Sequence, residues 1–141
     1  MDVGHTATKK SPLHLVAERG NPDLWKIAVQ RPDCDLNARD SYGNTPLMRA
    51  VICKSDKLIE AWLKDKNLVA KVDLTLTNGE GKTLLMLFLE HSTMRMFRLF
   101  LNSVNARDCV NMKDYDGHTA LLQASLMGKN FVSFSVLDLI E

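Results

Sequence analysis

Four segments of this chain carry the same short pattern, and this internal repeat constrains the fold more than any other feature. Gly43, Gly81 and Gly117 are each followed, two residues later, by a threonine. A related segment, KKSPLHLVAERG, has Lys9 at the glycine position and Ser11 at the threonine position. Successive copies are 34, 38 and 36 residues apart. Repeats of this length are typical of solenoids, in which each unit buries its apolar face only against its neighbours.

Each copy has the residues of a tight turn that leads into a short helix. The glycine can adopt the backbone conformation that a tight turn requires, and Asp40 and Asp114 lie three residues before their glycines as turn formers. The threonine that follows suits a helix N-cap, and Pro46 suits the first helical position. Only about seven mostly apolar residues follow each cap, too few for a stable isolated helix. These helices must therefore pack on others.

A second short helix is predicted in every copy, because apolar residues recur there at helical spacing. In the second copy, Leu58, Ala61 and Trp62 lie at positions i, i+3 and i+4, on one face of a helix. The predicted second helices cover residues 22–29, 56–63, 94–101 and 130–137. Such pairs can bury their faces only against neighbouring pairs, so we expect an all-α fold.

The repeated pattern resembles the ankyrin repeat, whose period is about 33 residues and whose signature is T-P-L-H-x-A. The matching segments are SPLHLVAERGN at 11–21, DLNARDSYGNTPL at 35–47, DYDGHTALLQASLMGKN at 114–130 and the more divergent NGEGKTLLMLFLEHST at 78–93. The resemblance implies an ankyrin-repeat α-solenoid of stacked helix pairs with projecting β-hairpin-like turns. The frame predicts an N-terminal tail at 1–8 and a repeat domain at 9–141, with repeats at about 9–38, 39–76, 77–112 and 113–141.

Three segments depart from the repeat pattern. Phe88 and Leu89 replace the small pair expected in the first helix of the third copy, and we expect them to widen the helix spacing there. Residues 64–75 and 102–111 exceed a 33-residue unit, and they are predicted to lengthen the loops before the next turns. A tolerated surface insertion is the simpler interpretation, and contact with a specific partner is the alternative.

Composition excludes several classes of protein. The 141 residues include 18 basic and 17 acidic side chains, and a net charge of +1 gives no general attraction to nucleic acid or anionic membranes. The scattered cysteines, Cys34, Cys53 and Cys109, imply no disulfide framework. The N-terminus lacks the apolar segment of a signal peptide, and no apolar run approaches the roughly 18 residues of a membrane helix. We expect a cytoplasmic or nuclear protein.

No motif predicts catalysis, a cofactor or a metal. The chain has no P-loop, dinucleotide-binding or H-E-x-x-H pattern, and the phosphate-like NGEGK lies in the repeat frame as a turn. His91 and Cys53 map to exposed ends of first helices, with no third group to orient a catalytic pair. His14 lies at the histidine position of the repeat, where the resemblance implies a structural hydrogen-bonding role. We expect a protein that is not an enzyme.

The resemblance also implies where a partner binds, because ankyrin-repeat proteins usually dock partners on turn tips and on the exposed side of the first helices. Tyr42 and Tyr115 are expected at adjacent turn tips, and tyrosine is enriched among binding hot spots. Ile52, Leu126 and Met127 are apolar where solvent favours polar residues; alternatively, some of these side chains only pack on neighbouring turns. The predicted partner-binding residues are Arg39, Ser41, Tyr42, Asn44, Ile52, Glu80, Lys82, His91, Lys113, Tyr115, Asp116, His118, Leu126 and Met127.

A second interface is predicted at the C-terminal end. In the last predicted helix, Phe131 and Phe134 occupy columns that hold charged residues in the other three copies, and they lie three residues apart on one face. Terminal repeats usually present a polar outer face. We expect a further repeat, a dimer mate or a partner to cover the two rings, unless a shift in helix register buries them.

The sequence thus predicts a non-catalytic protein-interaction module with a scaffold, inhibitor or targeting role. The alternative is the targeting region of a larger protein, such as a ubiquitin-ligase adaptor or an enzyme. Neither interpretation identifies the partner protein, because solenoid folds host many partners and specificity lies in variable surface residues.

Overall fold

The computed structural model describes residues 10–129 and 136–137, and these residues form eight helices and no strand. The helices are α1 (Pro12–Arg19), α2 (Pro22–Ala28), α3 (Pro46–Ile52), α4 (Asp56–Lys64), α5 (Lys66–Lys71), α6 (Leu84–His91), α7 (Met94–Ser103) and α8 (Ala120–Leu126). The all-α prediction is confirmed. Three of the predicted second helices, α2, α4 and α7, begin at the residues that the periodicity indicated. The fourth lies mostly outside the described residues.

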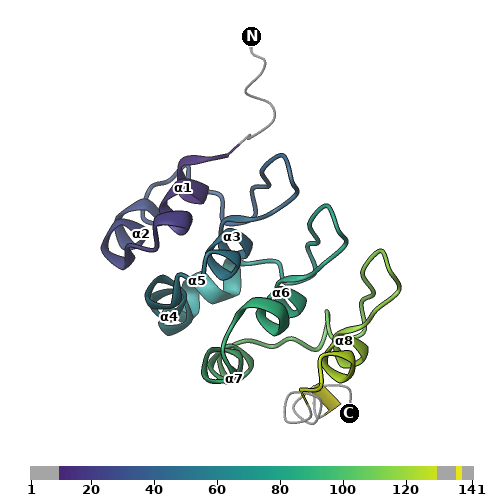
Figure 1. Ribbon diagram of the computed structural model, residues 1–141. Coiled ribbons are helices and arrows are strands. Elements are labelled where there is room, and N and C mark those ends of the chain that lie inside the picture. Colours follow the sequence, from purple (N-terminus) through teal and green to yellow (C-terminus); the bar gives the residue numbers. More distant parts are fainter. Residues whose placement is uncertain (1–9, 130–135, 138–141) are drawn as a thin grey trace. The chain divides into compact units, whose positions relative to one another are not determined.

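The chain divides into two compact units, residues 1–73 and 74–141, and each is described by itself. In the first unit, α1 packs on α3 and α2 packs on α4, so that two helix pairs lie side by side in two layers (Figure 1). The loop that leads into α3 projects away from the helices (Figure 1). In the second unit, α6 packs on both α7 and α8, and the loops before α6 and α8 project in the same manner (Figure 1).

Each projecting turn is closed by one acidic or amide side chain. The Oδ1 atom of Asp40 accepts hydrogen bonds from the backbone N–H groups of Tyr42 and Asn44, both at 2.9 Å. The Asp40 N–H donates to the carbonyl of Asn44 at 2.9 Å, and Gly43 takes a φ of 80°. Asn78 and Asp114 make the equivalent bonds in the next two turns. The turn-former prediction is confirmed. These turns are closed by side-chain hydrogen bonds, without a pair of β-strands on either side.

The predicted helix caps are also confirmed. The hydroxyls of Thr45, Thr83 and Thr119 each accept a hydrogen bond from the backbone N–H three residues later, at 3.2–3.3 Å. Ser11 does the same for α1, and Pro46 is the first residue of α3. These caps satisfy donors that a helix start leaves without intrahelical partners.

Large side chains fill the interior of each unit. Trp25 and Trp62 are fully buried in the first unit. In the second unit, every residue of Leu84–Leu89 is buried, which accounts for the apolar sequence of α6. The Phe88 ring stacks on Phe100 of α7 with 4.2 Å between centroids. The wider helix spacing expected at Phe88 and Leu89 stays a prediction.

The longer segment at 64–75 is not simply a lengthened loop, and that prediction is wrong in part. It contains α5, which begins where Asp65 Oδ1 accepts hydrogen bonds from the N–H groups of Asn67 and Leu68. Leu68 is buried, and α5 packs on α4. The Asn37 side chain fixes the end of this segment, because it donates to the Lys71 carbonyl at 3.1 Å. Residues 64–73 of this segment are therefore an ordered part of the first unit.

Candidate functional site

The turn before α3 presents some of its predicted contact residues to solvent and buries one of them. Arg39 and Ser41 are exposed, and 59% of the Tyr42 surface is accessible. Asn44 is only 5% exposed. The assignment of Asn44 to a partner-binding surface does not fit this burial. Its backbone N–H donates to Asp40 Oδ1 and its carbonyl oxygen accepts from the Asp40 N–H, so the Asn44 backbone helps to close the turn.

His14 links the first helix pair to this turn. Its Nε2 lies 2.7 Å from the carbonyl oxygen of Asn44, while its Nδ1 accepts a hydrogen bond from the Ser11 N–H at 3.1 Å. Because the backbone amide can only donate, Nδ1 is the acceptor and the ring hydrogen lies on Nε2. His14 is fully buried. The structural role that the resemblance implied for this histidine is confirmed.

Two neighbouring turns of the second unit are joined through Tyr115. Its backbone N–H donates to the Glu80 carbonyl at 3.1 Å. Its ring lies so close to Gly81 that a Cβ atom added there would approach Tyr115 Cδ1 to 2.5 Å. Even so, 76% of Tyr115 remains accessible. Within the second unit, the turn beside Tyr115 is thus the one at 78–82. The expectation that Tyr42 and Tyr115 occupy adjacent tips stays a prediction.

An ion pair holds Lys82 against its own repeat. The ammonium contacts the Glu90 carboxylate and lies 4.0 Å from Glu80. Burial alone lowers the pKa of Lys82, but the hydrogen bond and charge of Glu90 outweigh burial and hold this pKa above its ordinary value. Lys82 therefore stays charged and is held in position, while Glu80 is exposed to solvent.

The remaining predicted contact residues differ in their accessibility. Lys113 and Asp116 of the turn before α8 are exposed, and so are Leu126 and Met127 at the end of that helix, Leu126 by 65%. The half-buried residues are Ile52, His91 and His118. Exposed apolar side chains at the end of α8 are the clearest indication of a contact surface in the second unit. Phe131 and Phe134 lie outside the described residues, and the second interface stays a prediction.

The sequence did not reveal one charge cluster. The Glu18 carboxylate of α1 accepts hydrogen bonds from Nε and Nη2 of Arg49 in α3, at 3.0 and 2.6 Å, and lies 2.8 Å from Lys10 Nζ. The hydrogen bond from Lys10, followed by those from Arg49, outweighs burial and holds the pKa of Glu18 below its usual range. Only the packing of α1 on α3 brings these groups together, so no local pattern could have identified the pair.

The described part of the chain was searched for metal-binding groups, and none was found. Across residues 10–129 and 136–137, no three His, Cys, Asp or Glu side chains are grouped as metal ligands. Burial raises the pKa of the Cys109 thiol to about 11, so it is protonated at neutral pH. None of the described helices has the length and apolar character required to cross a membrane.

Comparison with known proteins identifies the family. A family model described as "Ankyrin repeats (3 copies)" matches residues 1–71, half of the chain. The chain belongs to the ankyrin-repeat family. NF-kappa-B inhibitor zeta from Homo sapiens and its Bos taurus counterpart are each 30% identical to this ankyrin-repeat chain, over 79% of the chain and 20% of the relative. Rabankyrin-5 from Homo sapiens is 28% identical over 93% of the chain and 11% of its own length.

These relatives are much longer than the part that they share with this chain. The alignments span a fifth or less of each relative's length. The ankyrin regions are therefore what the proteins have in common.

Proposed function

We propose that this ankyrin-repeat chain is a non-catalytic protein-recognition module whose partner contacts the turn tips and the exposed ends of the first helices. One observation carries the proposal. The hydrogen bonds that shape each turn use backbone groups and the side chains of Asp40, Asn78 and Asp114. Tyr42 and Tyr115 lie in these turns but leave most of their surface accessible.

Tyrosines in such positions favour binding. A tyrosine offers a large amphipathic contact and loses little conformational freedom when a partner covers it. Internal hydrogen bonds already order the turns, so little conformational entropy is lost there when a partner binds. Leu126 and Met127 add apolar surface in the second unit. Ankyrin repeats generally bind proteins, which is why a partner protein is favoured over a small ligand.

Affinity purification with quantitative mass spectrometry tests the proposal. The baits are the wild-type chain, Tyr42→Ala, Tyr115→Ala and the control Asn102→Ala, whose exposed residue lies on α7. Circular dichroism checks that every bait is folded. We expect at least one tyrosine variant to lose a partner by about tenfold, the effect of one moderate hot spot. Equal partner sets for all four baits would refute the proposal.

A second candidate is the targeting region of a larger protein, and the length of the relatives favours it. The relatives carry their ankyrin regions within chains roughly five times longer or more. The name of the 30%-identical relatives makes NF-kappa-B a specific first partner to test. Biolayer interferometry with purified NF-kappa-B subunits and the same variants gives that test. We place such an encounter in the cytoplasm or nucleus.

A further inference from the structure

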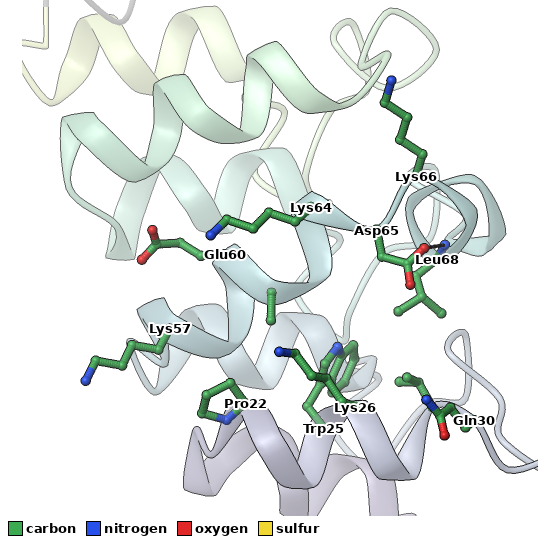
Figure 2. Close-up of a pocket in the computed structure, with 12 residues that line it drawn as sticks. Pro22, Trp25, Lys26, Gln30, Lys57, Glu60, Lys64, Asp65, Lys66 and Leu68 are labelled. Atoms are coloured by element: carbon green, nitrogen blue, oxygen red, sulfur yellow. Dashed lines mark hydrogen bonds between the residues drawn. The ribbon is translucent and has the colours of Figure 1, made fainter.

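A groove in the first unit lies among α2, α4 and α5 (Figure 2). The turn that leads into α3 contributes no residue to its lining. Its volume is about 730 Å³. Sites for drug-sized ligands are typically about 300–1,000 Å³. The wall on the α5 side exists only because residues 64–75 exceed the repeat length and fold as a helix. The insertion thus creates a concave surface that a plain helix pair lacks.

The floor of the groove is apolar and contains one unusual polar atom. Trp25, Ala61 and Leu68 line it, and Trp25 is 0% exposed. The indole Nε1 of Trp25 is buried, and no acceptor for its hydrogen exists among the described residues.

The rim of the groove is basic. Lys26, Lys57 and Lys64 line it and are exposed, and none of the three forms a salt bridge with a described residue. Figure 2 shows Lys26 extending across the groove, close to Trp25. The two carboxylates of the lining are Glu60 and Asp65, and the Asp65 carboxylate is already bonded to the start of α5. The rim therefore attracts negative charge.

We propose that this groove binds an acidic peptide segment of a partner protein, at a site separate from the turn tips. Carboxylates of the peptide would pair with Lys26, Lys57 and Lys64. An apolar side chain would lie on Ala61 and Leu68. A peptide is favoured over a small inorganic anion because the floor is apolar, and over nucleic acid because the chain's net charge is only +1.

Fluorescence anisotropy with defined peptides measures the binding. The probe is a fluorescein-labelled octapeptide of alternating glutamate and leucine, and two control peptides replace either glutamate by glutamine or leucine by serine. We expect saturable binding of the probe with a Kd below about 1 mM, and at least tenfold weaker binding of both controls. A probe that does not bind, or a serine control that binds equally well, would overturn the proposal.

Charge reversal then locates the site. Lys26→Glu/Lys64→Glu should weaken probe binding at least tenfold. The control Lys71→Glu/Arg107→Glu makes the same change in net charge at exposed residues outside the groove, and it should bind like the wild type. Equal losses in both double variants would show a nonspecific charge effect and refute the site.

The indole hydrogen gives a direct readout in the wild-type chain, independent of variant folding. The chain has two tryptophans, so a ¹H–¹⁵N spectrum contains two indole signals, which Trp25→Phe assigns. On adding the probe, the Trp25 signal should shift because the peptide covers the groove floor, while the Trp62 signal stays in place. If the Trp25 signal does not move, or if both signals move equally, the peptide does not occupy the groove floor.

Discussion

Gly81→Ala is expected to destabilise the second unit by about 2–5 kcal/mol. Gly81 has a φ of +77°, and a residue with a Cβ pays roughly 1–2 kcal/mol in that conformation. The new Cβ would also lie 2.5 Å from Tyr115 Cδ1 and 2.9 Å from the Tyr115 backbone nitrogen. The ring can turn aside, but the nitrogen is held by its bond to Glu80. Crowding of this kind typically costs about 1–3 kcal/mol more.

Gly117→Ala is the matched control for this effect. Gly117 has a φ of +83°, and a Cβ added there meets no atom within 4 Å. The control should therefore lower the free energy of unfolding only by the backbone strain of roughly 1–2 kcal/mol. The difference between the two variants isolates the contact between Gly81 and Tyr115.

Urea unfolding followed by circular dichroism at 222 nm measures both losses. Tyr115→Ala alone should change the unfolding free energy by no more than about 0.5 kcal/mol, because the side chain is mostly exposed. Combined with Gly81→Ala, it should recover part of the loss, with a coupling above about 0.5 kcal/mol in a double-mutant cycle. Equal losses for Gly81→Ala and Gly117→Ala, or no coupling, would refute the reasoning.

Three further predictions follow from the first unit and the thiols. His14→Leu should lower the unfolding free energy by about 1–3 kcal/mol, because the Asn44 carbonyl loses its bond from Nε2; an unchanged urea midpoint would contradict this. Glu18→Gln should cost about 1 kcal/mol or less at pH 7. Since folding lowers the pKa of Glu18, that difference should shrink as the pH falls below the ordinary value of 4.5, and a difference independent of pH would refute the pairing. In native protein at pH 8, Ellman's reagent should modify exposed Cys53 rapidly and Cys109, with its pKa of about 11, only on unfolding; equal rates would show that Cys109 is accessible.

The turns and caps could be predicted from sequence because their determinants are local. Asp40 and Thr45 each bond to backbone groups within four residues, so the pattern around Gly43 already contains the geometry. The starts of α2, α4 and α7 could be predicted for the same reason, since apolar periodicity and a preceding polar residue define a helix start.

The features that the sequence did not predict depend on tertiary packing. The helix α5 has only six residues, too few for a periodic signal, and it is stabilised by Asp65 at its start and by burial of Leu68. Asn44 is buried by tertiary packing, and Glu18 pairs with Arg49, which lies about one repeat later in the sequence. The basic rim of the groove likewise exists only after α5 packs on α4. Such contacts cannot be inferred from local sequence patterns.

The closure of the turns by Asp40, Asn78 and Asp114 has a consequence for how such a protein changes its partners. Each of these side chains accepts hydrogen bonds from backbone N–H groups at the following positions, which almost any residue can supply. The side chains at Tyr42 and Tyr115 can therefore be exchanged with little loss of stability. Mutation can explore new specificities at these tips without first acquiring compensating changes in the core. The same property makes positions 42 and 115 suitable for randomised libraries from which new binders are selected.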